Sequence, residues 1–362
     1  MSDAGHPEYV RTVHCDHPRF WAGDLESIYA EVEAAGVGDV TRIAQSPGGR
    51  PVYAVAYGDR EPFVSRANFS SAAGAHDLTA YADKSSRTRP VAIILGQVHG
   101  NETNASTGCV NLMHLLETGE DLAGRKWPDL LQAAAACRVI VVPVANPDGV
   151  ARFSRGCHVG NSRAEVEYWA QGTHRDGSLW GWPGFKGNHP MHGDVGFVGC
   201  NLNDAGVNPM HDEFFSPYSQ EAPAILRLAR EEAPELICGL HAHPTAVAVL
   251  QPAYVPIYIK REAADLAERL KQAYIEAGIP YSEPFVPAAD GEQPPAPAFN
   301  LTSALFHSSG ALSFTLECPC GMVADNALSC SHGEMLDMQL VLYRECFRYA
   351  RLRLEAWPGA VC

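Results

Sequence analysis

The chain has 362 residues, 46% of them hydrophobic and 19% charged, which is enough apolar material for one large folded core. The formal net charge of −15 argues against nucleic acid or an anionic membrane surface as a partner, because phosphate binding needs clustered Lys and Arg. The sequence contains no run of about 18 apolar residues, so we expect no membrane-spanning helix.

Cysteine usage and the polar stretch 1–10 bear on the cellular compartment. The 11 cysteines are scattered, and stretch 1–10 lacks the charged and then apolar pattern of a secretory signal. We therefore expect reduced thiols rather than a disulfide framework, and a cytoplasmic protein. The sequence predicts no particular oligomeric state.

Apolar periodicity predicts strands and helices that alternate along the chain. In chain order we expect a helix at 24–35, strands at 40–44, 51–57 and 91–98, a helix at 103–116, a strand at 137–144, a helix at 219–232, a strand at 236–240, a helix at 261–277, a strand at 312–316 and a helix at 333–356. This alternation predicts an α/β fold with a central mixed, mostly parallel β-sheet and helices on both faces.

The spaces between these elements define the expected domain organisation. Residues 59–89 are polar and irregular, and 283–298 are rich in proline. Residues 150–218 combine many Gly, His, Asn and Trp with little periodicity, and a loop of that length is usually functional in a compact domain. We expect one domain over 1–362, with 1–38 as an N-terminal helical extension and 150–218 as an active-site loop region.

Polar side chains follow three of the predicted strands. His99 and Glu102 come after the apolar run that starts at Val91, at the edge where open α/β sheets bind ligands. An imidazole and a carboxylate three residues apart can bind one cation, although such a pair also occurs by chance. His241 and Glu317 end two further strands, and a buried carboxylate there needs a partner or a role in proton transfer.

The order of these residues resembles the zinc carboxypeptidase family, the carboxypeptidase A-like metallopeptidases, with relatedness to the aspartoacylases and succinylglutamate desuccinylases. The resemblance spans roughly residues 40–356 and rests on three stretches, which are Ile43-Ala-Gln-Ser-Pro-Gly-Gly-Arg50, Gly96-Gln-Val-His-Gly-Asn-Glu-Thr103 and Asn146-Pro-Asp-Gly149. It implies one Zn²⁺ ion bound by His99, Glu102 and His241, with Glu317 as the general base. Zinc would acidify a water molecule, and Glu317 would take its proton and pass it to the leaving amine.

One departure from the family pattern concerns the substrate. Family peptidases hold the terminal carboxylate of the substrate with an Asn-Arg pair, and here Asn203 is followed by Asp204. Because an Asp repels a carboxylate, we expect that the usual clamp does not hold the substrate end. Asp204 would favour a cationic or hydroxyl group if it faces the pocket, and otherwise it would pair with a nearby Arg or point away.

The remaining site predictions are assigned within this resemblance. Arg155 is chosen to stabilise the oxyanion, and Arg152 is a second basic residue in the same interval. His243 and His307 are predicted to contact substrate, the latter because the interval 293–311 has no match for the tyrosine of the family.

The resemblance implies a zinc-dependent metallopeptidase-like hydrolase that acts on a small peptide or peptide-like metabolite. Two alternatives stay open, namely an N-acyl amino acid amidohydrolase of the aspartoacylase type and an inactive binding module. The Asn146-Pro-Asp-Gly149 stretch favours the peptidase, and the presence of every zinc ligand and of the base disfavours the binding module.

Overall fold

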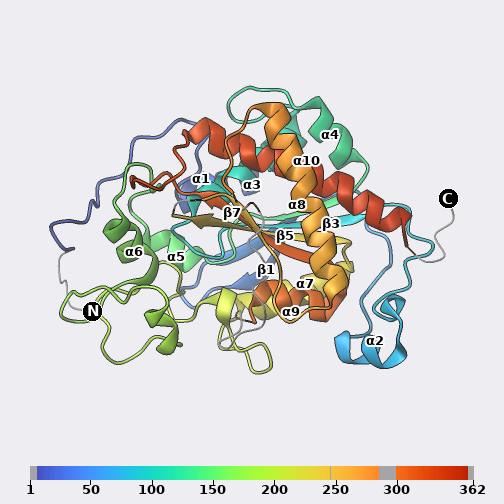
Figure 1. The fold of residues 1–362 in the computed structure, drawn as a ribbon, viewed down its shortest axis with the longest axis horizontal. Helices are drawn as coiled ribbons and strands as arrows, with labels where there is room; N and C mark the ends of the chain where they lie inside the picture. Colours follow the sequence, from blue (N-terminus) through green and yellow to red (C-terminus); the bar gives the residue numbers. More distant parts are fainter. Residues whose placement is uncertain (1–5, 245, 284, 286–298, 358–362) are drawn as a thin grey trace.

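A mixed β-sheet forms the centre of the molecule (Figure 1). The computed structural model describes residues 6–244, 246–283, 285 and 299–357, and within them seven strands lie in the order β1-β2-β4-β3-β5-β7-β6. Their bounds are β1 Asp39–Gln45, β2 Pro51–Tyr57, β3 Val91–Leu95, β4 Arg138–Val142, β5 Leu236–His243, β6 Ala248–Leu250 and β7 Leu312–Pro319. The neighbours β4, β3, β5 and β7 are parallel, and the outer pairings are antiparallel, so the predicted fold class is confirmed.

Helices cover both faces of the sheet (Figure 1). They are α1 Leu25–Ala34, α2 Phe69–Ala75, α3 Thr103–Thr118, α4 Pro128–Ala135, α5 Pro147–Arg152, α6 Arg163–Gln171, α7 Glu221–Glu232, α8 Ile257–Ala277, α9 Leu301–Ser309 and α10 His332–Glu355. Side chains from α3, α4, α8 and α10 pack in one hydrophobic cluster, and those from α7 and α9 pack in another. Ala92 and Ile94 of β3 belong to the first cluster, and Val91 and Ile93 to the second, which explains the unbroken apolar run of this strand.

Most predicted elements are present with small shifts at their ends, whereas shorter ones were missed. The prediction gave no structure to α2, α4, α5, α6, α9 or β6. Of these, α6 carries a sequence signal, because Ser162 and Glu165 form a capping box at its start. The predicted helical extension is helical only in α1, and residues 6–24 before it are irregular. Most of the proline-rich stretch 283–298 lies outside the described residues.

The expectation that all thiols are reduced is wrong for one pair. Cys15, before α1, forms a disulfide with Cys157, after α5, and their Cα atoms are 6.2 Å apart. The two positions are separated by 142 residues, so no local spacing in the sequence indicated the bond. The other eight cysteines in the described part of the chain are free and buried.

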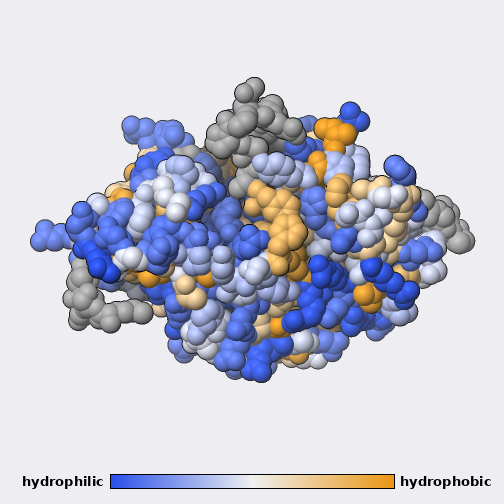
Figure 2. Space-filling model, turned by 90° about the horizontal axis from the view of Figure 1, so that it is seen from below, coloured by the Kyte–Doolittle hydropathy of each residue, from blue (hydrophilic) through white to orange (hydrophobic). Residues whose placement is uncertain are grey.

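No described helix combines the length and the apolar character that crossing a membrane requires. Figure 2 shows one face of the molecule, on which hydrophilic side chains predominate and hydrophobic ones form small groups.

A buried charge cluster fixes the starts of the two strands that carry the predicted metal ligands. Glu235, which is 1% exposed, precedes β5 and accepts a hydrogen bond from the backbone N–H of Val91 at 2.6 Å. Its carboxylate also pairs with Lys84 at 3.0 Å and with Arg87 at 2.9 Å. The side chain of Glu235 therefore ties the start of β3 to the start of β5.

Replacing Glu235 with Ala should lower the free energy of unfolding by about 3–5 kcal/mol, because two buried cations would lose their counter-charge. Urea unfolding followed by tryptophan fluorescence would measure this loss. The matched control is Glu355→Ala on α10, which breaks an exposed pair with Arg351 and should leave stability unchanged within error. Equal effects of the two substitutions would contradict this description of the cluster.

Candidate active site

Two neighbouring strands bring the predicted metal ligands together. His99 and Glu102 lie in the turn between β3 and α3, where Glu102 occupies the N-cap position, and His241 lies in β5. Because β3 and β5 pair in parallel, with Leu95 opposite Gly239, their carboxyl ends meet at the same edge of the sheet. Gly100 allows the turn to approach α5, since a Cβ atom there would lie 2.0 Å from the carbonyl carbon of Gly149.

The three side chains converge through their potential ligand atoms. Glu102 Oε1 lies 2.9 Å from His99 Nδ1, and Glu102 Oε2 lies 3.0 Å from His241 Nδ1. The two Nδ1 atoms are themselves 3.2 Å apart. A tetrahedral zinc ion with bonds of about 2.0–2.2 Å holds its ligand atoms at slightly larger separations, so small rotations would admit the ion. Two imidazoles and one carboxylate are a common zinc donor set, and this group fits a zinc ion.

Because the three polar side chains are buried, their close approach without a cation is energetically unfavourable. His99, Glu102 and His241 are only 9%, 7% and 4% exposed. Burial raises the pKa of Glu102, but the charges and hydrogen bonds of the two imidazoles outweigh it and hold the carboxyl below its usual range. The site is therefore organised around an ionised carboxylate, which is the form that binds metal.

Glu317 lies beside the ligands on the next strand. In the pairing of β5 with β7, Glu317 is the direct partner of His241. Burial raises the pKa of Glu317, His241 opposes the increase and the negative charge of Glu102 adds to it, which together bring the pKa to about 7. The side chain keeps partial access to solvent. A carboxylate whose pKa lies near neutrality can accept a proton and release it again, as a general base requires.

A hydrogen-bond chain that the sequence did not reveal orients Asn101, between the two ligands of the turn. His158 Nε2 lies 3.1 Å from the amide nitrogen of Asn101, and His158 Nδ1 lies 3.1 Å from that of Asn161. Asn161 accepts a hydrogen bond from Arg155 through its oxygen, so its NH₂ group donates to His158 Nδ1.

The tautomer of His158 follows from that chain. Burial lowers the pKa of His158 to about 4, so the ring is neutral near pH 7 and carries its proton on Nε2. That proton needs an acceptor, which only the amide oxygen of Asn101 can supply, and this oxygen has no other partner among the described residues. We therefore assign Asn101 with its oxygen towards His158 and its NH₂ group on the opposite side.

Arg155 contacts the N-terminal segment in this structure. Its guanidinium donates to the backbone oxygen of Val13 at 2.6 Å and to Asn161 at 3.3 Å. None of its hydrogen bonds reaches a predicted metal ligand, so a role at the oxyanion would require the guanidinium to leave Val13. That role stays a prediction.

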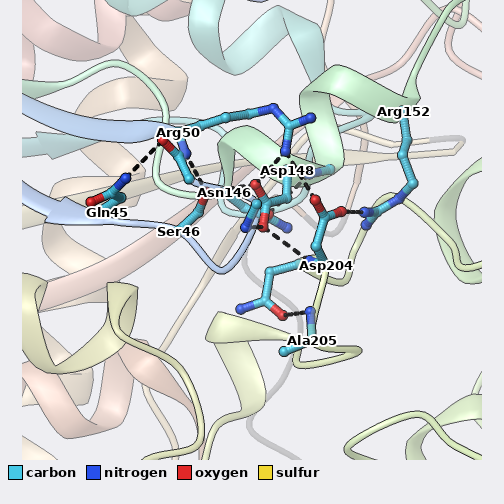
Figure 3. A network of polar contacts seen from close by, with 12 residues as sticks. Gln45, Ser46, Arg50, Asn146, Asp148, Arg152, Asp204 and Ala205 are labelled. Atoms are coloured by element: carbon cyan, nitrogen blue, oxygen red, sulfur yellow. Dashed lines mark hydrogen bonds and ion pairs between the residues drawn. The ribbon is translucent and has the colours of Figure 1, made fainter.

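Asp204 belongs to a network of paired charges (Figure 3). Arg50 Nη1 bridges Asp148 at 2.8 Å and Asp204 at 2.9 Å, and Arg152 pairs with the other oxygen of Asp204. Of the alternatives open at the sequence level, pairing with nearby Arg side chains is the one observed. The two guanidinium groups neutralise the two carboxylates, so Asp204 presents no unpaired negative charge to a substrate.

Residues near Asp204 stabilise the loop that contains it. Asn203 is fully buried, donates to Glu221 at 3.2 Å and accepts from the backbone N–H groups of Ala205 and Val207. Arg152 also donates to the backbone oxygen of Leu202. These contacts are internal, and a substrate-binding role for Asn203 or Arg152 stays a prediction.

The two remaining predicted histidines differ in their surroundings. His243 is exposed near the end of β5, and its Nδ1 accepts from the backbone N–H of Ala246. His307 lies on α9, where it packs against Phe69 and hydrogen-bonds the backbone oxygen of Tyr254 at 2.8 Å. Neither of these two hydrogen bonds involves a metal ligand, and the substrate role of both residues stays a prediction.

The pKa of His211, in the long loop, is affected both by the metal ligands and by Lys186. Burial lowers the pKa of His211 to about 2, and the positive charges of Lys186, His99 and His241 add to that effect. The ammonium of Lys186 lies 3.9 Å from the centre of the Trp182 ring. Among the described residues no carboxylate forms an ion pair with Lys186, whose pKa is lowered by burial.

A buried two-histidine, one-carboxylate group beside a proton-accepting glutamate, at the carboxyl edge of an α/β sheet, defines a metal-dependent hydrolase. The zinc carboxypeptidase family model matches residues 33–211, which include His99 and Glu102. The chain belongs to the zinc carboxypeptidase family and is a metallocarboxypeptidase-like hydrolase.

Solved structures agree in fold. The chain is similar to a metallo-carboxypeptidase from Burkholderia cenocepacia, with 14% identity, a TM-score of 0.53 and coverage of 90% of this chain and 68% of the other. For a Pseudomonas aeruginosa metallo-carboxypeptidase in complex with (2-guanidinoethylmercapto)succinic acid, the identity is 15% and the TM-score 0.54, with coverage of 91% of this chain and 69% of the other. For bovine thrombin-activatable fibrinolysis inhibitor, the identity is 13% and the TM-score 0.51, with coverage of 92% of this chain and 98% of the other. At these identities the likeness shows the fold alone, and a comparison with curated proteins finds no match.

Replacing His241 with Ala should remove zinc, because a single imidazole and a carboxylate bind the ion far more weakly than three ligands. In non-reducing buffer, elemental analysis after dialysis should give about one zinc per chain for the wild type and nearly none for the variant. His243→Ala, two residues further along β5, is the control and should keep its zinc. Retention of zinc by His241→Ala would contradict the assigned ligand set.

Proposed function

We propose that the protein hydrolyses an amide bond near the end of a peptide or peptide-like substrate, with one Zn²⁺ held by His99, Glu102 and His241. The observation that supports this most directly is the convergence of those three ligand atoms beside Glu317 across the pairing of β5 with β7.

The residues of the chain divide the chemistry between them. When bound, zinc supplies Lewis acidity towards the scissile carbonyl and lowers the pKa of a water molecule. Glu317 accepts the proton of the attacking water and returns it to the leaving amine. The NH₂ group of Asn101, oriented by His158, donates to the oxygen on which negative charge develops.

Recognition of the substrate end is assigned to Lys186 rather than to the Asn203–Asp204 pair. Asp204 is neutralised by Arg50 and Arg152, and Asn203 is committed to Glu221, so neither provides a positive charge for a carboxylate. Lys186 is half-buried on Trp182, and its charge and those of the metal ligands all act on His211. A free terminal carboxylate on the substrate supplies the counter-charge that Lys186 otherwise lacks.

A panel of substrates tests the proposed reaction. Purified zinc-loaded protein would be assayed with peptides that carry free or amidated carboxyl ends and with N-acyl amino acids. Peptides with free carboxyl ends should be cleaved fastest. Exclusive cleavage of N-acyl amino acids would instead indicate the aspartoacylase-type activity, and binding without turnover of any compound would indicate a binding module.

The Glu317→Gln variant should keep its zinc and lose activity by a factor of about 10²–10⁴, because the amide cannot accept the proton of water. Steady-state kinetics on the best peptide, with elemental analysis of the same sample, would measure both properties. A variant with full zinc and a rate within about threefold of the wild type would exclude Glu317 as the base.

The Lys186→Gln variant should raise KM for free-carboxylate peptides by about 10- to 150-fold, the loss expected for a hydrogen bond to a charged group, with a smaller effect on kcat. Lys186→Arg should restore most of the affinity, and Lys126→Gln, at an exposed lysine remote from the site in sequence, serves as the control. An unchanged preference for free over amidated ends in Lys186→Gln would rule out this assignment.

A further inference from the structure

A second group of metal-binding side chains lies where the N-terminal segment meets the first turn of α10. Cys15, Cys157 and His332 come from three segments that are distant in sequence, and each offers a ligand atom within 4.8 Å of the others. The two cysteines are joined as a disulfide. The backbone N–H of Cys15 also donates to the backbone oxygen of Arg155 at 2.8 Å, which keeps the N-terminal segment against the loop.

His332 is placed as a ligand but has no partner for one of its nitrogens. It is the first residue of α10, and its ring lies edge-on to Trp21 with centroids 4.6 Å apart. Its Nε2 atom is buried without a hydrogen-bond partner among the residues that the structure describes. Native proteins rarely leave such an atom unsatisfied, and the adjacent disulfide cannot donate a proton to it. The unpartnered nitrogen is a second observation, independent of the cysteine pair, that points to a ligand.

We propose that the reduced protein binds a second zinc ion through Cys15, Cys157 and His332. Two thiolates and one imidazole form a donor set typical of zinc, and water or a further side chain completes the four-coordinate shell. This site is separate from the active site, which contains no thiolate.

Reduction must precede metal binding, and its chemistry balances with an external dithiol. The dithiol gives two electrons and two protons to the Cys15–Cys157 disulfide and becomes a disulfide itself. Zinc then displaces the two thiol protons to solvent as it binds the thiolates. A neutral imidazole binds metal without losing a proton.

The two states of this site would serve the same structural purpose. Either a disulfide or a bound zinc ion holds the N-terminal segment against the loop that contains His158, and His158 contacts Asn101 beside the active-site ligands. In a reducing compartment, zinc would preserve the link that the disulfide provides under oxidising conditions.

Cobalt replacement tests this inference on the full chain. Metal-free protein, oxidised or reduced with a phosphine that is then removed without air, would be titrated with Co²⁺. The oxidised form should bind about one Co²⁺ per chain, and the reduced form about two. Only the second ion should produce the near-ultraviolet charge-transfer band of a cobalt–thiolate bond. Reduced wild-type protein that binds a single ion without this band would overturn the proposal, and this measurement needs no variant.

Variants identify the ligands and separate the two sites. Cys157→Ser and His332→Ala should each lose the second ion in reduced protein and keep the first. Cys330→Ser, which alters a free buried thiol two residues from His332, should keep both. Reduced His241→Ala should show the thiolate band while lacking the active-site ion, so failure of the proposed catalytic function would not be mistaken for failure of this inference. A thiolate band that persists in Cys157→Ser would also overturn the assignment.

Discussion

The parallel pairing of β3 with β5 is the constraint on which the rest of the structure depends. It brings the turn after β3 and the end of β5 to one edge, where three buried ligand atoms approach one another within about 3 Å. Glu235 fixes the other end of the same two strands through Val91 and two cations. The position of β7 then follows from its pairing with β5, which places Glu317 opposite His241. The candidate metal site and its candidate base thus result from strand register rather than from flexible loops.

Paired charges explain how the chain accommodates Asp204 after Asn203. Asp148 is fully buried and accepts hydrogen bonds from Ser46, the backbone of Gly48 and the backbone of Asp204. Together with Asp204, Arg50 and Arg152 it forms a network without net charge, which ties the β1–β2 turn to the long loop (Figure 3). An Asp at position 204 is therefore consistent with a structural role.

The sequence predicted the parts of the site that depend on strands. Residues at the ends of apolar runs share one edge once the strands are parallel, which indicated a common edge for His99, Glu102, His241 and Glu317. Their roles as ligands and base came from the resemblance to the family. No comparable rule predicts the direction of a side chain in a loop. Asp204 pairs with Arg50 across 154 residues, and Arg155 turns to Val13 across 142. His158 orients Asn101 through hydrogen bonds with Asn101 and Asn161, and these three residues come together only in the folded loop. The Cys15–Cys157 bond was missed for the same reason.

The central claim is that His99, Glu102 and His241 surround one metal ion beside Glu317. X-ray diffraction from crystals of the zinc-loaded protein, recorded on both sides of the zinc absorption edge, would test it most directly. The account predicts an anomalous peak within about 2.0–2.2 Å of Nδ1 of both histidines and of a carboxylate oxygen of Glu102. A zinc peak bound by other side chains, with these three residues unliganded, would contradict it.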